Sequence, residues 1–293
     1  MRPTTPIVES GAARPSGSEQ LMVRMLASDD DLRACVDLQR ATWGASYDEL
    51  VPATILKVAQ KIGGVAAGAF DENGQMLGFV FGMAGVRNGE IIHWSDMLAV
   101  REDARDRGVG QRLKEFQRAA ARTSGATTMY WTYDPLVARN AHMNFNRLGV
   151  RVDEYVEDMY GASESDLHRG LGTDRFVVAW PLDRAPGGGR RTVSPSSADM
   201  VPVLNPDGQV PTSSELGAAL DGDVIRVEIP LDIVRVRDRH PDEAVRWRAS
   251  TRVSIQAALG SGFGVARFAS DPGRDRGWYL MTRAAGTGGP ATR

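Results

Sequence analysis

Strand-like and helix-like patterns of apolar residues follow one another through the first 182 residues. Alternating or continuous apolar runs, typical of strands, lie at 21–26, 65–70, 75–85, 90–100, 127–134, 153–161 and 175–182. Stretches with helical spacing lie at 29–44, 109–125 and 137–149. In the second of these helices Val109, Leu113, Phe116 and Ala120 form one apolar stripe. This mixture of strands and helices predicts an α/β fold.

A second segment has fewer elements. Strand patterns at 201–205, 224–230, 263–268 and 277–282 surround one helix at 241–260, which predicts a β-β-α-β-β extension. The Pro-, Gly- and Ser-rich stretch 183–198 reads as a linker between the two segments. We therefore expect a disordered tail (1–19), a first domain (20–182), the linker (183–198), an extension packed on that domain (199–283) and a second tail (284–293).

Composition narrows the class of protein. The 293 residues carry 35 Lys and Arg against 37 Asp and Glu, a net charge of -2, so no basic surplus favours nucleic-acid binding. No apolar run approaches the ~20 residues of a membrane span, and the N-terminus lacks the apolar core of a signal peptide, so we expect a cytoplasmic protein. The single Cys35 predicts a buried structural thiol. Four histidines and one cysteine show no metal-ligand spacing.

A basic turn between a strand and an amphipathic helix is the most informative stretch. A helix N-terminus offers N–H groups without intrahelical partners and a partial positive charge. Gly108 and Gly110 let the backbone approach a bulky ligand, and Arg105, Arg107 and Arg112 add positive charge. The pattern predicts an anion site that fits a pyrophosphate. The Gly-x-Gly-x-x-Gly spacing of dinucleotide-binding loops is absent.

The same turn, RDRGVG at 105–110, resembles the signature of the GNAT superfamily of acyl-CoA N-acyltransferases, which has Arg or Gln, two residues, Gly, any residue, then Gly or Ala. The resemblance implies a three-layer α+β sandwich whose central sheet splays where acetyl-CoA, or another acyl-CoA, enters. Coenzyme binding is implied for Leu98, Ala99 and Val100, which pair with the pantetheine arm, and for Arg105, Arg107, Gly108, Val109, Gly110, Gln111 and Arg112 around the pyrophosphate.

The helix at 137–149 also resembles the superfamily, with one departure. Asn140 matches an Asn that contacts the coenzyme, but Phe145 occupies the position of the Tyr that protonates the departing thiolate. Four other tyrosines could replace that general acid, or the thiolate could leave unassisted. The replacements are Tyr130, Tyr133, Tyr155 and Tyr160.

A long, little-characterised subset of the superfamily is closer still, and its resemblance covers most of the chain. The matching stretches are Ser95-Asp96-Met97-Leu98, Trp131-Thr132-Tyr133-Asp134-Pro135-Leu136, Asn140-Ala141, Tyr160-Gly161, Asp174-Arg175 and Trp247-Arg248. Asp96 stands where the subset has His, so the chemistry at that strand can differ. The resemblance to this subset does not indicate the acceptor, the acyl length or the oligomeric state, and a homodimer is one alternative.

Transfer to an amine needs a base for the attacking ammonium, and Asp96 and Asp134 are the carboxylate candidates. Strand alternation puts Asp96 on the face of Leu98, where it can act as a base or pair with an Arg. Asp134 precedes Pro135, so an Asx-turn or helix cap competes with catalysis. The alternatives are His93 and His142, each more often an ordinary core histidine.

The helix at 241–260 carries two arginines beside its apolar stripe. Arg248 lies at the edge of the stripe of Trp247, and Arg252 lies on its flank. A guanidinium there needs an anionic partner. An internal salt bridge to Glu228 or Asp232 is favoured, and the alternatives are the coenzyme's phosphates or an acidic acceptor, which would make both arginines substrate-binding.

The resemblance implies transfer of an acyl group, first of all acetyl, from coenzyme A to an amine of a small molecule. Catalysis would rest on Asp96, Asp134 and Tyr160. One alternative is a catalytically silent acyl-CoA-binding protein, which the Phe145 departure supports. Another is an acyltransferase that draws on a carrier protein or an aminoacyl-tRNA.

Overall fold

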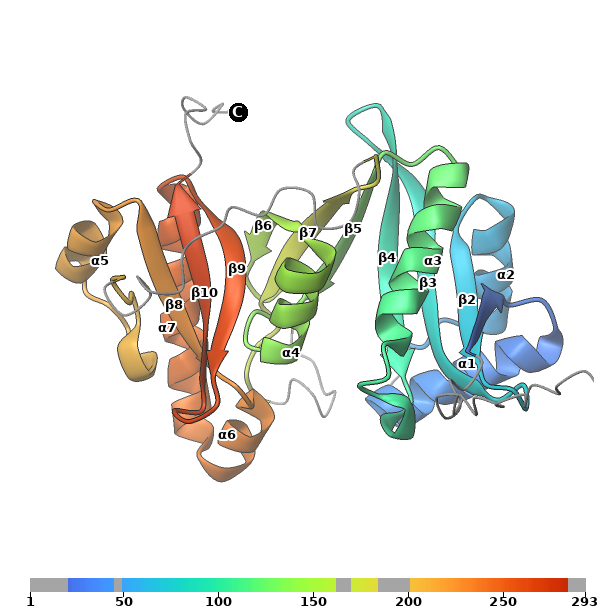
Figure 1. The fold of residues 1–293 in the computed structure, drawn as a ribbon, viewed down its shortest axis with the longest axis horizontal. Helices are drawn as coiled ribbons and strands as arrows, with labels where there is room; N and C mark the ends of the chain where they lie inside the picture. The colour runs from blue at the N-terminus through green and yellow to red at the C-terminus, as the bar shows by residue number, and fades with distance from the viewer. Residues whose placement is uncertain (1–20, 45–48, 162–169, 184–200, 284–293) are drawn as a thin grey trace, which may run out of the picture.

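The computed structural model describes residues 21–44, 49–161, 170–183 and 201–283. The predicted tails and nearly all of the predicted linker lie outside these residues. The described chain contains a seven-stranded sheet and a separate three-stranded sheet, each with helices packed on it (Figure 1).

The seven-stranded sheet forms from the first segment, in the order β1-β2-β3-β4-β5-β7-β6. All of its neighbours are antiparallel except β4 and β5, which run parallel. All seven predicted strands are confirmed. The strands are β1 (Met22–Met25), β2 (Val65–Phe70), β3 (Met76–Arg87), β4 (Glu90–Val100), β5 (Thr128–Tyr133), β6 (Arg151–Val156) and β7 (Arg175–Pro181).

Helices cover both faces of this sheet and make three layers. Helices α1 (Asp29–Trp43) and α2 (Ala53–Lys61) pack on one face, through a cluster that includes Phe79 and Met97. On the other face, α3 (Val109–Thr123) packs through Leu113. The helix predicted at 137–149 is there too, as α4 (Ala138–Ala141) continued by a π-helical stretch (His142–Leu148).

The sequence prediction omitted helix α2. It has nine residues, and its N-cap is Pro52, which makes no side-chain capping bond. Helix α1, which was predicted, instead begins with a capping box in which Ser28 accepts from the N–H of Asp31. The buried thiol of Cys35 lies on α1 and is confirmed as a core residue.

The second segment forms the three-stranded sheet β8-β10-β9 with three helices. The strand predicted at 201–205 is only a single bridge between Val203 and Arg226, so the predicted β-β-α-β-β order is wrong in its first strand. Pro202 and Pro206 flank that bridge and have no N–H to extend a ladder. The elements are α5 (Ser213–Leu220), β8 (Val224–Pro230), α6 (Ile233–Arg239), α7 (Pro241–Gly260), β9 (Phe263–Asp271) and β10 (Arg276–Arg283).

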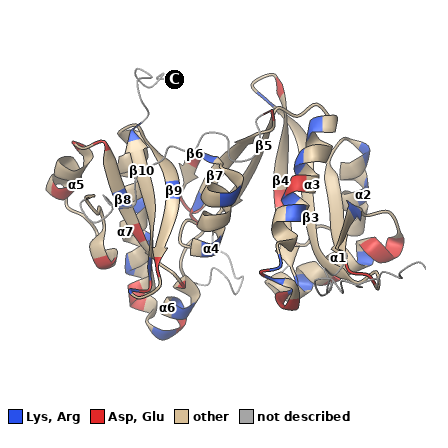
Figure 2. Ribbon diagram, in the orientation of Figure 1, with Lys and Arg blue, Asp and Glu red and all other residues tan. Residues whose placement is uncertain are grey.

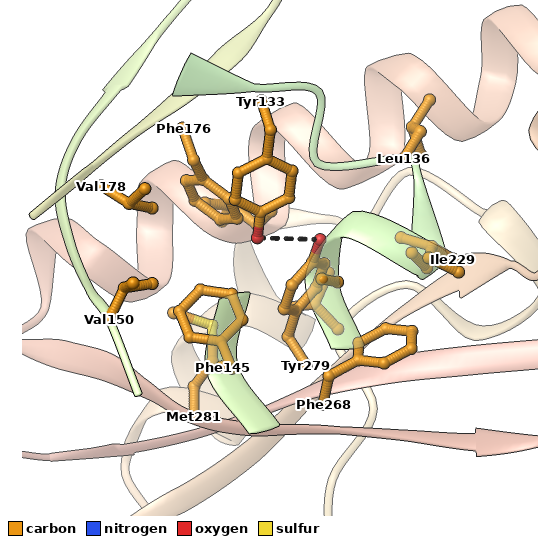
Figure 3. Packing of buried hydrophobic residues seen from close by; sticks show 14 of the residues in the cluster. Tyr133, Leu136, Phe145, Val150, Phe176, Val178, Ile229, Phe268, Tyr279 and Met281 are labelled. Atoms are coloured by element: carbon orange, nitrogen blue, oxygen red, sulfur yellow. Dashed lines mark hydrogen bonds between the residues drawn. The ribbon is translucent and has the colours of Figure 1, made fainter. Parts of the chain in front are cut away.

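One continuous apolar core joins the two segments. Tyr279 of β10 is fully buried and packs edge-on against Phe145 and Phe176 of the first segment, with ring centroids 5.9 and 5.6 Å away (Figure 3). Its hydroxyl donates to the carbonyl of Pro135 at 2.6 Å and lies 3.5 Å from the hydroxyl of Tyr133. The predicted stripe of α7 is buried in the same core, with Trp247 fully enclosed.

Within the described ranges, no helix combines the length and the apolar character needed to cross a membrane.

Candidate functional site

The two parallel strands at the centre of the sheet separate after a short contact. β4 and β5 pair only from Ile92–Trp94 to Thr128–Tyr130, and then diverge toward their carboxyl ends (Figure 1). Beyond Trp94, β4 keeps its antiparallel ladder with β3, in which Leu98 lies opposite Val80. Within the part of the chain that the structure describes, the edge of β4 that faces β5 therefore lacks a strand partner from Ser95 to Val100. Such an edge can accept an extended chain through backbone hydrogen bonds.

A helix begins at the open end of this divergence. After β4, a 3₁₀ turn (Glu102–Ala104) leads to Gly108, the N-cap of α3, which has a left-handed φ of 77°. No side chain caps the first N–H groups of α3. A Cβ placed on Gly108 would meet no atom within 4 Å, and one placed on Gly110 would make ordinary contacts with Leu98 at 3.6 Å and Val100 at 3.7 Å. The backbone of the turn is therefore open to a bulky anion.

Basic side chains surround this helix start. Arg105, Arg107 and Arg112, which were predicted to add positive charge here, are exposed. Figure 2 shows both basic and acidic positions on the ribbon where α3 begins. Arg139 of α4 reaches the turn and pairs with Asp106 at 3.1 Å. This contact brings the start of α4, with the half-buried Asn140, next to the turn. The predicted phosphate-binding residues thus share one region with the β4 edge.

These observations identify the fold. The structure contains the predicted three-layer α+β sandwich. Its central sheet splays between two parallel strands, and a glycine turn follows the first of them. The described chain has the GNAT fold. The open β4 edge and the uncapped start of α3 are the two places that the resemblance assigns to the pantetheine arm and the pyrophosphate.

Solved structures of N-acetyltransferases are similar to this chain. A putative acetyltransferase from Salmonella typhimurium, solved with acetyl-CoA, is 18% identical, with a TM-score of 0.45, over 57% of this chain and 98% of that one. The ribosomal-protein-S18-alanine N-acetyltransferase from Escherichia coli is 16% identical (TM-score 0.43; 57% and 97%). An aminoglycoside 6'-N-acetyltransferase complexed with coenzyme A is 14% identical (TM-score 0.41; 56% and 99%). No protein-family model and no curated protein matches the sequence.

Asp96 lies at an irregularity of β4 in the GNAT sheet. The β3–β4 register shifts there, because Met97 lies opposite Phe81 while Ser95 lies opposite Gly82. The extra residue overturns the prediction that Asp96 and Leu98 share a face: Leu98 packs on the α3 side, whereas Asp96 interacts with Glu49, which precedes α2. Desolvation first, and the charge of Glu49 second, raise the pKa of Asp96. Asp96 still reaches solvent, so this desolvation is partial.

Tyr160 lies beside β5 on the face that α3 does not cover. Its hydroxyl is 2.9 Å from the hydroxyl of Thr132, and the guanidinium of Arg175 stacks 5.1 Å from its ring. Thr132 has the same strand parity as Tyr130, which packs with Trp94 in a small cluster on this face. Tyr160 is 47% exposed, so the residue is open to solvent.

Asp134 and Arg248 form an ion pair inside the protein. The guanidinium donates to both carboxylate oxygens, at 2.9 and 2.5 Å, and each side chain is only 6% exposed. Asp134 also accepts the N–H of Leu136 at 2.8 Å, which is the predicted Asx-turn. The internal salt bridge predicted for Arg248 is confirmed, but its partner is Asp134 and neither Glu228 nor Asp232. Because both groups are enclosed and paired, we leave them out of the proposed site.

Arg252 is held by three carboxylates. It pairs with Asp174 at 2.6 Å, and with Asp158 and Glu157 at 3.4 Å. Burial acts to raise the pKa of Asp174, but the hydrogen bonds from Arg252 and from Tyr155 lower it. Asp174 forms its ion pair with Arg252 and also accepts the hydroxyl of Tyr155, whereas Arg175 donates to the backbone carbonyl of Asp174. This network ties α7 to the loop before β7 and leaves Arg252 with a structural role.

The candidate replacements for the superfamily's general acid differ in access. Phe145 packs in the core between Tyr133 and Tyr279. Burial raises the pKa of Tyr133 well above that of a free tyrosine. Burial, and then the hydrogen bond to Asp174, likewise raise the pKa of Tyr155. Among these tyrosines, Tyr160 alone has an exposed side chain.

A buried polar row between α3 and β4 was not predicted. Lys114 donates to Ser95, and the next turn of the helix brings Gln117 to 3.1 Å from the Nε2 of His93. Burial first, and the charge of Lys114 second, lower the pKa of His93 to about 4, so this histidine is neutral at pH 7. No signal in the sequence indicated it, because the predicted apolar stripe of α3 contains Leu113 but not its neighbour Lys114, which is buried as well.

No group of three or more His, Cys, Asp or Glu side chains in the described ranges could hold a metal ion.

Proposed function

We propose that the protein transfers an acyl group, first of all acetyl, from coenzyme A to an amine of a small molecule. One observation carries the proposal: the open edge of β4 leads directly to an uncapped helix start behind Gly108. The strand edge suits the amide-rich pantetheine arm, and the helix start with its three exposed arginines suits the pyrophosphate. The coenzyme would then enter from the side of α3 and α4.

The acceptor would approach from the opposite face, on which Asp96 and Tyr160 lie. Asp96, with its raised pKa, is suited to remove a proton from the attacking ammonium, directly or through a water molecule. The hydroxyl of Tyr160 can hold the acceptor by a hydrogen bond. Backbone N–H groups of β4 near Leu98 would stabilise the oxyanion that forms when the amine attacks the thioester.

The proposal is tested by two measurements on the full chain. Calorimetry with acetyl-CoA measures binding, and a thiol-release assay over a panel of small amines measures transfer. We expect binding together with amine-dependent release of coenzyme A. An absence of acetyl-CoA binding would overturn the proposal.

A second function is favoured by Phe145. If the chain is a silent acyl-CoA-binding protein, acetyl-CoA binds tightly and no amine in the panel releases the thiol. The two functions therefore give opposite results in the same assay. A third function, transfer from a carrier protein or an aminoacyl-tRNA, is tested by supplying those donors in place of acetyl-CoA.

A further inference from the structure

Lys114 places an amino group that can carry a positive charge inside the protein, where β4 and β5 part. It lies on the second turn of α3 and is 3% exposed. Its ammonium donates to the hydroxyl of Ser95 on β4 at 2.6 Å and lies 4.0 Å from the centre of the Trp131 ring on β5. Ser95 immediately precedes Asp96, and the β4–β5 pairing has ended one residue earlier, at Trp94. The ammonium therefore bridges the two strands at the closed end of the splay.

Among the described residues, the side chains that contact this ammonium, Ser95 and Trp131, carry no charge. Besides Ser95 and Trp131, the titratable group that senses its charge is His93, whose lowered pKa keeps it uncharged at pH 7. From the π-helical stretch after α4, Asn144 accepts the indole N–H of Trp131 at 3.1 Å. Lys114 forms no ion pair within the described ranges. Burial lowers the pKa of Lys114 to about 7.

A buried cation without a counter-ion is costly, and a transient anion at the same place would relieve that cost. Acyl transfer produces such an anion, the coenzyme's thiolate. The coenzyme would be held at the start of α3, and Lys114 lies on the same helix and the same face of the sheet. The amine would attack from the opposite face, so the sulfur departs toward the side of Lys114.

We propose that Lys114 is a catalytic residue that holds its ammonium against the departing sulfur of coenzyme A. The inference rests on the proposed acyl transfer. As the tetrahedral intermediate collapses, the C–S bond breaks and its electron pair goes to sulfur, which leaves as a thiolate paired with the ammonium. Asp96 passes the first proton of the ammonium to solvent before the attack, and it takes the second proton from nitrogen as the amide forms. The charge of Lys114 thereby stabilises the thiolate that, in the superfamily, is protonated by a tyrosine at the position of Phe145.

The test uses coenzyme A itself and needs no acceptor. The ultraviolet absorbance of the thiolate reports the pKa of the bound thiol, in the wild type and in Lys114→Met. Desulfo-coenzyme A, which lacks the thiol, reports binding that is independent of sulfur. The matched control is Lys57→Met, which removes an exposed lysine paired with Asp29 on the opposite face of the sheet.

We expect the bound thiol to titrate about one unit or more below free coenzyme A in the wild type and in Lys57→Met. In Lys114→Met the bound thiol should titrate near free coenzyme A, with the affinity for desulfo-coenzyme A unchanged. If the wild type binds both ligands but does not lower the thiol pKa, or if Lys114→Met lowers it equally, the inference is wrong and the proposed function stands. If neither ligand binds the wild type, both fail.

Discussion

Arg248 of α7 and Asp134 at the end of β5 form a two-point ion pair inside the protein, across 114 positions of sequence. The pair joins the C-terminal segment to the strand that borders the splay. It lies beside Tyr279, whose hydroxyl donates to the carbonyl of Pro135, the residue after Asp134. The two segments are thus connected by polar contacts as well as by the apolar core of Figure 3.

Removal of one member of this pair should be strongly destabilising. Arg248→Met leaves the Asp134 carboxylate buried without its partner, which we expect to cost about 3–5 kcal/mol in the free energy of unfolding. The control is Arg235→Met, which breaks the more exposed pair with Asp275 and should cost less than about 1 kcal/mol. Denaturant unfolding measures both. Equal losses of unfolding free energy in the two variants would show that the buried pair contributes no more to stability than the exposed one.

Truncation after Pro181 should expose the core that the second segment covers. Tyr133, Phe145 and Phe176 would each lose the contact with Tyr279, and exposing a large apolar side chain costs about 1.5–3 kcal/mol. We expect a lower melting temperature and lower solubility. Truncation after Arg283 is the control and should change neither. A shortened chain that stays soluble and melts like the full one would show that the two segments are independent.

The charge of Lys114 should make stability depend on pH. Burial lowers its pKa to about 7, from 10.5 in the unfolded chain, so between these values the unfolded state binds the extra proton. Stability from this group therefore increases as pH rises from 7 to 10.5, by about 1.4 kcal/mol per pH unit. Lys114→Met should remove this slope and be more stable than the wild type at pH 7. An unchanged slope would contradict the burial of a titrating ammonium.

Asp96 should matter for turnover more than for coenzyme binding. With an amine that the panel identifies, Asp96→Asn should lower kcat about 100-fold and leave the affinity for acetyl-CoA unchanged. The wild-type rate should fall as pH drops through the pKa of Asp96. Glu49→Gln removes a like charge that raises this pKa, so it should shift the acid limb to lower pH. Wild-type kcat and pH profile in Asp96→Asn would remove this carboxylate from the mechanism.

Long alternating patterns and glycine turns were sufficient to predict the sheet and the phosphate turn. Strand β4, for example, has the predicted bounds, Glu90–Val100. The same alternation misled at Asp96, since a register shift inserts one residue that no single-strand pattern reveals. Helix α2 lacked a capping signal, and the strand at 201–205 was stopped by its prolines.

Contacts between distant segments could not be predicted. The apolar surroundings of Arg248 predicted that its guanidinium pairs with an anion. Local patterns favoured the nearer Glu228, but the partner, Asp134, lies on the other segment. The burial of Lys114 depends on two strands that part beneath α3, which no helical stripe encodes. Sequence therefore indicated which groups needed partners, and the fold determined which partners they found.

Binding of acetyl-CoA to Gly108→Trp tests the central claim most directly. Gly74 is a matched control, because its φ of 76° equals that of Gly108 within one degree and a Cβ there also meets no atom within 4 Å, but it lies in the β2–β3 turn. Both tryptophans carry the same backbone strain, whereas only the one at 108 occupies the path of the pyrophosphate. Calorimetry should show an affinity about 100-fold weaker or lost in Gly108→Trp, and a wild-type affinity in Gly74→Trp. A folded Gly108→Trp protein that binds acetyl-CoA like the wild type would contradict the account.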